Sequence, residues 1–236
     1  MRHTVIINVL AFVAAAFATA CDDGRIYPVD ADLSDDNGMR VIMTGTITGA
    51  GTAYESGYTL ALAAFDDGNE FAVVSKTVGD GSEAVELVNV SPSVSSIELC
   101  VINSLRKRIA TLASISVSGS AGERVEFEIG DVDASPFAVI NHEIFSTTCI
   151  QCHGATGHAA AGLDLRAEEA YGMLVGVAST VENGMQRVCP GDAAASTLWR
   201  AVATDVSSSW SFHHNNLLTP DRCGFIENWI NNTQDD

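Results

Sequence analysis

The chain has 236 residues, with 12 lysines and arginines against 30 aspartates and glutamates, so its formal net charge at pH 7 is −18. Such a negative surface repels phosphate and argues against nucleic acid as a partner, while it favours a protein partner that carries a basic docking patch. Solubility alone explains the charge equally well. The length suffices for one large or two small domains.

The first twenty residues have the pattern of an export signal. Arg2-His3 precedes an apolar run without charge over residues 4–20, which is typical of a signal peptide. The run ends in Ala18-Thr19-Ala20-Cys21, which resembles a bacterial lipobox, in which the cysteine receives lipid. We therefore predict a lipoprotein signal peptide over residues 1–20, lipidation of Cys21, and a lipid anchor in a membrane of the bacterial cell envelope, either the outer membrane or one facing the periplasm.

Two alternatives for this segment stay open: an ordinary signal peptide with a spare cysteine, and an uncleaved anchor helix. Each of them still leaves the rest of the chain outside the cytoplasm. Residues 21–39 are rich in Asp, and we expect them to form an acidic tether.

Residues 40–134 have the pattern of an all-β domain. Short runs rich in Val, Ile, Thr and Ser are separated by Gly or Asp, and helical patterns are almost absent. The predicted strands cover residues 41–48, 58–65, 71–77, 84–90, 96–103, 108–117 and 124–129. Seven strands predict a sandwich, for which an immunoglobulin-like arrangement is the preferred topology.

This β region contains no cluster of nucleophile, base and acid, and no histidine occurs between His3 and His142. We therefore expect a spacer or docking domain rather than a catalytic one. An adhesive or glycan-binding platform is the alternative, because the region contains several aromatic residues, although single aromatics in strands are more often core residues. These aromatics include Tyr54, Tyr58, Phe65 and Phe71.

The character of the sequence changes at Ser135-Pro136, where a capping hydroxyl and a proline predict the start of a helix. Thr219-Pro220 repeats this start for a last helix, and two further short helices are predicted at 167–175 and 194–202. We therefore expect residues 135–236 to form a second, all-α domain.

The segment Cys149-Ile150-Gln151-Cys152-His153 follows the first of these helices. This C-x-x-C-H spacing is the attachment pattern of c-type haem, in which two thiols bind one porphyrin and the adjacent imidazole is the proximal iron ligand. A zinc site needs a second ligand pair, and a redox dithiol is expected after a strand. The pattern therefore predicts one covalent haem c, bound by Cys149, Cys152 and His153.

The other cysteines are widely spaced in the chain. If Cys21 receives lipid, Cys100, Cys189 and Cys223 remain. In an oxidising compartment we expect a disulfide between Cys189 and Cys223, with Cys100 as a buried free thiol. Two separate buried thiols at Cys189 and Cys223 are the alternative.

Five motifs follow one another in this half of the chain, in the order Cys149-Ile150-Gln151-Cys152-His153-Gly154, Gly162-Leu163-Asp164-Leu165-Arg166, Arg187-Val188-Cys189-Pro190-Gly191-Asp192, Ser196-Thr197-Leu198-Trp199-Arg200 and Asn228-Trp229-Ile230. In this order they resemble the planctomycete-type branch of the cytochrome c domain family over about residues 136–233. The resemblance implies an all-α cytochrome c fold with one covalent haem, and it implies nothing about the β region.

The chain departs from this family at the sixth iron ligand. Family members usually have a methionine shortly before the last helix, whereas this chain has His213-His214 there. We predict that His213 or His214 is the distal ligand, which gives a six-coordinate haem of low potential. Ligation by Met173 or Met185, or an open iron, are the alternatives. His142 and His158 are expected to be surface groups.

These observations predict a membrane-tethered monohaem cytochrome that carries single electrons to or from a redox protein partner and transforms no substrate. One alternative is a haem ligand-binding or peroxidase-like protein with an open sixth site. Another is an adhesive or glycan-binding lipoprotein with an accessory haem domain.

Overall fold

The computed structural model describes residues 38–51, 54, 57–154, 159–166, 168–204, 206, 210 and 212–234. The predicted signal peptide, Cys21 and nearly all of the predicted tether lie outside the described residues, as does His158. One compact unit, Asp36–Asp236, contains all the helices and strands of the described residues. Within the described residues, no helix has the length and apolar character needed to cross a membrane.

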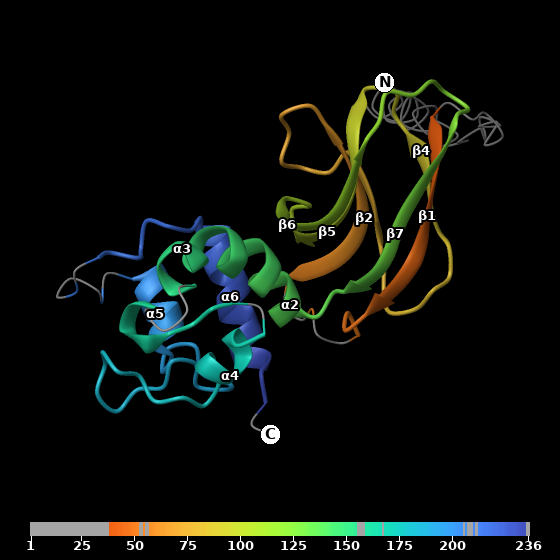
Figure 1. Ribbon diagram of the computed structural model, residues 1–236. Coiled ribbons are helices and arrows are strands. Elements are labelled where there is room, and N and C mark those ends of the chain that lie inside the picture. Colours follow the sequence, from red (N-terminus) through yellow and green to blue (C-terminus); the bar gives the residue numbers. More distant parts are fainter. Residues whose placement is uncertain are drawn as a thin grey trace, which may run out of the picture. The chain divides into compact units, whose positions relative to one another are not determined.

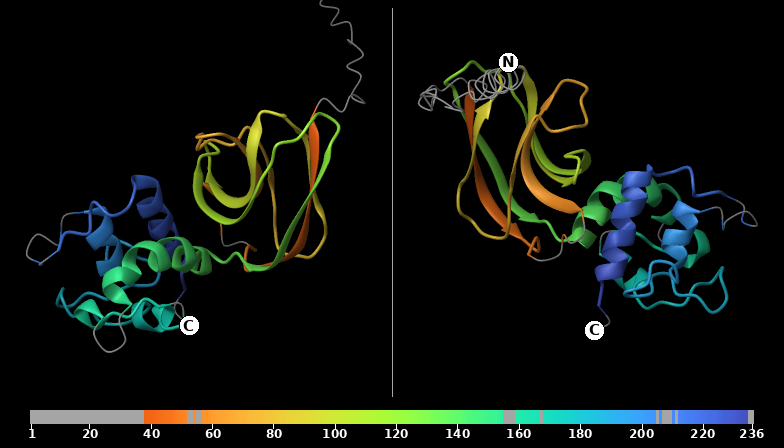
Figure 2. Two further views of the ribbon diagram at one scale, coloured as in Figure 1. Left: turned by 45° about the horizontal axis from the view of Figure 1, so that its top comes forward. Right: turned by 180° about the vertical axis from the view of Figure 1, so that it is seen from behind.

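Seven strands lie within the described residues and form two sheets (Figures 1 and 2). Each predicted strand overlaps an observed one, and we call residues 39–133 the sandwich. One sheet has the order β4-β1-β7 and the other the order β3-β2-β5-β6. The strands are β1 (Met39–Thr48), β2 (Tyr58–Asp66), β3 (Val74–Thr77), β4 (Val85–Val90), β5 (Val94–Asn103), β6 (Arg108–Ser116) and β7 (Arg124–Asp133).

The side-chain pattern explains why these runs form strands. In β1 the buried residues Met39, Val41 and Met43 alternate with more exposed neighbours, which is the period of a strand with one face in the core. The middle of β2 and of β5 is buried on both faces. A second, smaller apolar cluster that includes Phe65 and Cys100 accounts for this, because it covers the other face of their sheet.

The immunoglobulin-like arrangement is wrong in its strand order. That fold places its first, second, fourth and fifth strands in one sheet, whereas here β1 lies between β4 and β7, and β2 lies in the other sheet. The parallel pairing of β1 with β7, from Arg40 opposite Arg124 to Thr48 opposite Asp133, joins segments more than 80 residues apart. Alternation along a strand shows which of its faces is buried, but not which strand it pairs with. The strand order could therefore not be predicted from the spacing of the apolar runs.

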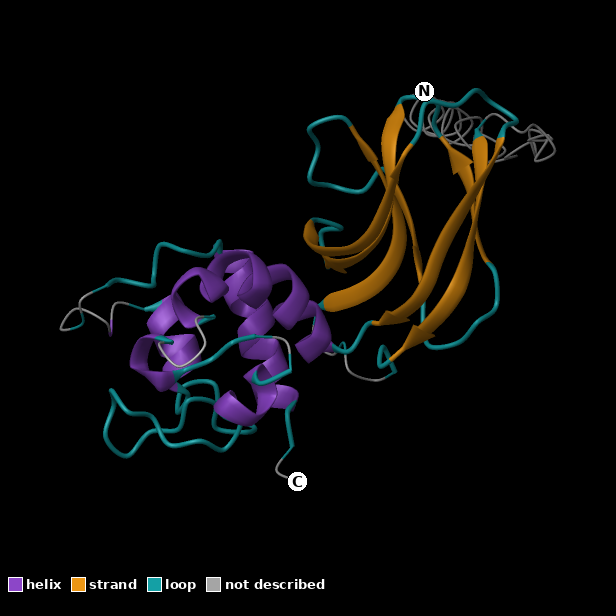
Figure 3. Ribbon diagram, in the orientation of Figure 1, coloured by secondary structure: helices purple, strands orange, loops and turns teal. Residues whose placement is uncertain are grey.

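The prediction of an all-α second domain is also wrong. In the described part of the chain, residues in strands outnumber residues in helices. Several helices after residue 135 have five residues or fewer, and loops join them (Figure 3). We call residues 136–232 the helical part. Its elements are α2 (Pro136–Ile140), η1 (Asn141–Cys149), α3 (Ile150–His153), η2 (Ala160–Gly162), α4 (Ala170–Leu174), α5 (Thr197–Ala203) and α6 (Pro220–Asn232).

Between α4 and α5 the chain runs through turns and isolated strand bridges instead of a helix. Val175 pairs with Val188, and Gln186 pairs with both Ala178 and Ser196. Gly176 and Gly184 have positive φ angles, at 71° and 80°, in this segment, and glycine adopts that conformation without steric cost. The predicted helices at 167–175 and 194–202 thus contract to five and seven residues.

One continuous apolar core extends through the sandwich and the helical part. At the junction Tyr54 stacks on Phe225 of α6, with ring centroids 6.2 Å apart and planes 1° apart. The ring of Tyr58 also packs on Phe225, at 5.1 Å. A side chain at Gly224 would place its Cβ 2.9 Å from the Tyr58 hydroxyl, so glycine allows this close approach. Burial at this contact raises the pKa of Tyr54, to which the charge of Asp133 adds.

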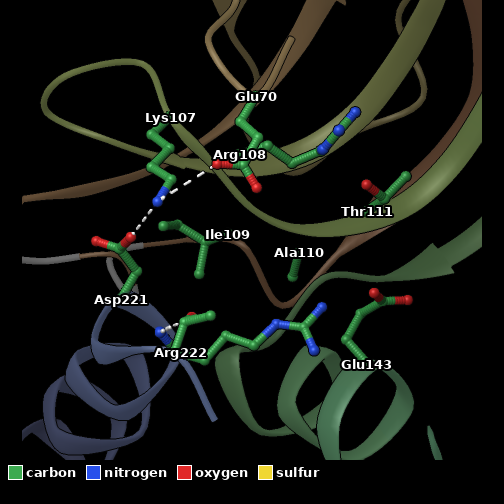
Figure 4. Close-up of a pocket in the computed structure, with 10 residues that line it drawn as sticks. Glu70, Lys107, Arg108, Ile109, Ala110, Thr111, Glu143, Asp221 and Arg222 are labelled. Atoms are coloured by element: carbon green, nitrogen blue, oxygen red, sulfur yellow. Dashed lines mark hydrogen bonds and ion pairs between the residues drawn. The ribbon is translucent and has the colours of Figure 1, made fainter. Parts of the chain in front are cut away.

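A cavity of about 300 Å³ lies where β6 and η1 meet the start of α6 (Figure 4). The Lys107 ammonium donates a hydrogen bond to Asp221 at 2.7 Å and lies 3.6 Å from a Glu70 carboxylate oxygen. The lining of the cavity has as many cationic as acidic side chains. The cationic ones are Lys107, Arg108 and Arg222, and the acidic ones are Glu70, Glu143 and Asp221. This balance of charge gives the cavity no preference for an anion or a cation.

Candidate haem site

The helix that leads to the C-x-x-C-H segment is a π-helix. The Ile150 N–H donates to the Phe145 carbonyl, five residues back, at the end of η1. The Thr147 hydroxyl donates to the Glu143 carbonyl at 2.7 Å and so satisfies a backbone acceptor of the same helix. π-Helices are rare and frequently occur at functional sites. Here η1 connects the buried residues Ile144 and Phe145 to α3, which carries the haem motif.

Gly154 ends α3 directly after the motif. A Cβ at this position would lie 2.6 Å from the Ile150 carbonyl oxygen and would also overlap the Ile150 side chain. Real Cβ atoms do not approach a backbone oxygen so closely, so a larger residue requires the turn after His153 to open. The glycine therefore allows the chain to leave α3 without moving the imidazole.

The side chain of His153 is oriented by the segment Leu163–Leu165. Its Nδ1 donates to the Leu163 carbonyl at 3.2 Å, and its own carbonyl accepts a hydrogen bond from the Leu165 N–H at 2.7 Å. When Nδ1 is the donor, Nε2 carries the lone pair and is free to bind a metal. This arrangement gives the Gly162-Leu163-Asp164-Leu165-Arg166 motif a physical role.

Asp164 closes the turn that presents these two backbone groups. Its carboxylate accepts hydrogen bonds from the Arg166 backbone N–H at 3.1 Å and from Arg166 Nε at 2.9 Å. These hydrogen bonds lower the pKa of Asp164, so its carboxylate is ionised at neutral pH. The turn is thus held from within, independently of any bound group.

His153 lines a cavity of about 460 Å³, a size typical of ligand pockets. Both motif cysteines line it as well, and most of the other lining side chains are apolar. They include Leu163, Leu165, Leu174, Val181, Leu198, Ala201, Val202, Trp210, Phe212, Leu217 and Leu218. A porphyrin is a flat and largely apolar group, so this lining suits its faces.

His214 faces His153 across the cavity. Their ring centroids are 6.2 Å apart and their planes differ by 37°. Two imidazole nitrogens bound about 2 Å from one metal on opposite sides would place the ring centroids roughly 6 Å apart. Trp210 and Phe212 pack edge-on against the His214 ring, at 5.7 and 5.3 Å. Burial, and next to it the neighbouring His153, lower the pKa of His214, which keeps the imidazole neutral and able to bind a metal.

The structure separates His214 from the other candidates for a distal ligand. His213 is exposed, and neither it nor Met173 nor Met185 lines the cavity. The sulfur of Met173 lies 3.9 Å from an Arg187 nitrogen, and that of Met185 lies 4.0 Å from an Arg200 nitrogen. His142 is exposed and contacts Glu143, as the sequence predicted for a surface group.

The motif thiols are free and differ in exposure, with Cys149 half-buried and Cys152 exposed. Burial raises the pKa of Cys149 to about 11, and the Cys152 thiol adds to the shift. Both thiols line the same cavity as the His153 imidazole, and neither is bonded to another cysteine. Two free thiols, an oriented imidazole, a second imidazole opposite and an apolar lining together fit a covalently bound haem.

The thiols of Cys189 and Cys223 are both free in the structure, which therefore does not contain the predicted disulfide. Cys223 lies on the inward face of α6, where its thiol donates to the Val202 carbonyl at 3.4 Å. Cys189 lies in a tight turn, where its N–H donates to the Ser196 hydroxyl at 2.8 Å. Cys100 is a buried free thiol, as expected, and burial raises its pKa.

Sequence reasoning missed the roles of Leu163 and Arg187 at this site. Leu163 acts through its backbone carbonyl, which no side-chain pattern reveals. Arg187 lines the cavity with only 9% of its surface exposed. A signal was present in the sequence, because Arg187 opens one of the family motifs and arginine is seldom buried without a polar or charged partner.

Comparison with known proteins agrees with this geometry. The model of the family described as planctomycete cytochrome C matches residues 149–209. The matched segment begins at Cys149 and includes Leu163 and Arg187, but it ends before His213 and His214 and leaves out the sandwich. No curated protein and no solved structure matches the chain. This partial match suggests a c-type cytochrome, and such a domain implies haem c as its cofactor.

Proposed function

We propose that this protein carries single electrons through one covalently bound haem, outside the cytoplasm and on a membrane-tethered chain. The observation that supports it best is that the His153 and His214 rings face each other across a cavity lined by both motif thiols. Their ring centroids are 6.2 Å apart. Protein ligands on both sides of an iron favour electron transfer, whereas binding or activation of a small molecule requires an accessible position.

The residues that would hold the haem have separate tasks. The Cys149 and Cys152 thiols would hold it through thioether bonds, and the imidazoles of His153 and His214 would bind its iron. The haem supplies a one-electron iron couple when bound. The Leu163 carbonyl fixes the His153 tautomer and increases the basicity of the metal-binding nitrogen. The apolar lining keeps water from both faces, and two imidazoles give a lower reduction potential than an imidazole with a methionine.

The remaining parts of this proposal rest on sequence. A lipidated Cys21 would anchor the chain in the cell envelope, and the acidic surface, with a net charge of −18, would attract a redox partner through a basic patch. Association with such a partner weakens as the salt concentration rises, because counterions screen the attraction.

The distal ligand is tested with His214→Ala and its neighbour His213→Ala, in protein produced with a haem-attachment system. We expect the wild type and His213→Ala to have low-spin, six-coordinate spectra and to bind carbon monoxide slowly in the reduced state. His214→Ala should become high-spin and bind carbon monoxide rapidly, because one axial position is open.

Two results would contradict this assignment. One is an unchanged spectrum in His214→Ala, which means that another group binds the iron. The other is a sulfur-to-iron absorption band in the oxidised wild type, which means methionine ligation. Rapid carbon monoxide binding by the wild type would instead support a ligand-binding or peroxidase-like protein.

A further inference from the structure

Arg187 is a buried cation at a cavity whose lining is mostly apolar. Its residue surface is 9% exposed. Among the described residues that line the cavity, it is the single lysine, arginine, aspartate or glutamate. Burying a charge is costly unless an opposite charge accompanies it.

The backbone of Arg187 is held on both sides. Its N–H donates to the Val177 carbonyl at 2.7 Å, and its carbonyl accepts from the Leu198 N–H at 2.9 Å. Strand bridges at the neighbouring residues, Gln186 and Val188, restrain it further. The side chain therefore enters the cavity from a fixed position.

Backbone carbonyls orient the guanidinium. Nη1 donates to the Met173 carbonyl at 2.9 Å, and Nη2 lies 3.4 Å from the carbonyls of both Ala161 and Gly162. These carbonyls accept hydrogen bonds from the guanidinium, but they carry no net charge and do not neutralise it. Within the described part of the chain, Arg187 forms no ion pair with a carboxylate. Two arginines of the helical part do form ion pairs, unlike Arg187. Arg166 pairs with Asp164, and Arg200 pairs with Glu182.

We propose that Arg187 binds a propionate carboxylate of the haem, an inference that rests on the proposed function. Haem has two propionates at its edge, and both are anions that the acidic chain would otherwise repel. A guanidinium binds a carboxylate more strongly than a neutral donor does, and its planar shape matches that of the carboxylate. The missing counter-charge of Arg187 would thus be part of the cofactor.

The contacts of Arg187 also connect this site to the proximal ligand. The carbonyls of Ala161 and Gly162 belong to η2, and the next residue, Leu163, accepts the hydrogen bond from His153. One arginine therefore contacts the turn that leads to the His153-binding carbonyl and also lines the cavity. A purely structural role accounts for the first contact but not for a cation in the cavity.

The inference is tested by measuring the reduction potential of the haem-loaded protein between about pH 4 and pH 8, a range that includes the usual pKa values of a glutamate-like carboxylate and of an imidazole. The variants are Arg187→Gln, Arg187→Lys and, as the matched control, Arg200→Gln. Arg200 has the same charge, but it does not line the cavity and pairs with Glu182 at 3.2 Å.

We expect Arg187→Gln to have a lower potential than the wild type at pH 8, because a nearby cation stabilises the reduced state. As the pH falls, its potential should rise more steeply than that of the wild type, because a propionate without its cation takes up a proton at higher pH. Arg187→Lys should keep most of the wild-type potential, and Arg200→Gln should match the wild type in pH dependence. Identical potentials and slopes in Arg187→Gln and Arg200→Gln would overturn the inference.

If Arg187→Gln does not acquire haem, Arg187→Lys decides the question by resonance Raman spectroscopy. Its propionate bending band should shift relative to the wild type, because lysine lacks the planar guanidinium, whereas the band of Arg200→Gln should not. An unchanged band in Arg187→Lys would overturn the inference. A wild-type protein without haem would instead contradict the proposed function.

Discussion

The imidazoles of His153 and His214 are held in different ways, and the difference explains why the sequence identifies only one of them. His153 follows a motif whose spacing defines its task. His214 is one of two adjacent histidines, and the choice between them depends on the path of the chain from Trp210 to Leu218. In the structure the aromatic contacts of Trp210 and Phe212 go to His214. These contacts come from tertiary packing, which a single sequence does not show.

At the same scale, Gly154 should be essential for an ordered motif. In Gly154→Ala the new Cβ would lie 2.6 Å from the Ile150 carbonyl oxygen, so α3 must shift and move His153. We expect a clear loss of covalently bound haem, measured by haem staining and absorbance against total protein. Gly172→Ala in α4 is the control, because a Cβ there meets nothing within 4 Å. Equal haem content in the two variants would contradict this role of Gly154.

At the scale of elements, the predicted helix starts are confirmed. The Ser135 hydroxyl accepts a hydrogen bond from the Ala138 N–H, and the Thr219 hydroxyl accepts one from the Arg222 N–H, each at 3.4 Å. A proline follows each cap. These signals are local, since a capping hydroxyl and the N–H that donates to it lie within one turn of helix, and a sequence alone therefore shows them.

The π-helix η1 was not predictable in the same way. The apolar residues of this region recur at the spacing of an ordinary α-helix, and they pack into the core. These residues are Phe137, Ile140, Ile144 and Phe145. The hydrogen bond from Ile150 to Phe145 widens the helix by one residue. The segment between α4 and α5 was missed for a related reason, because its bridges join residues that only the folded chain brings together.

The cap of α6 gives a stability prediction. Thr219→Ala removes the acceptor for the Arg222 N–H and should lower the free energy of unfolding by about 1 kcal/mol. Thr219→Ser keeps a hydroxyl and should stay close to the wild type. Urea unfolding followed by circular dichroism measures both. Equal stability of the alanine and serine variants would show that the hydroxyl contributes nothing at this helix start.

At the scale of the whole molecule, two features extend beyond the haem-binding segment. The apolar core that begins in the sandwich continues into the helical part, and Lys107 of the sandwich side pairs with Asp221 of α6. The family match covers residues 149–209. The sandwich and the adjacent histidines His213 and His214 therefore lie outside that match. The sandwich thus contributes to the support of α6, which packs against the haem-binding segment.

The central claim is that one haem is joined to Cys149 and Cys152. It is tested most directly by the intact mass of the chain, produced in a host with a haem-attachment system, beside the double variant Cys149→Ala, Cys152→Ala. We predict that the wild type carries the added mass of a single haem and gives the pyridine haemochrome spectrum of a c-type haem, and that the double variant carries neither. A wild-type chain without added haem mass, or a double variant with the same covalent addition, would contradict the account.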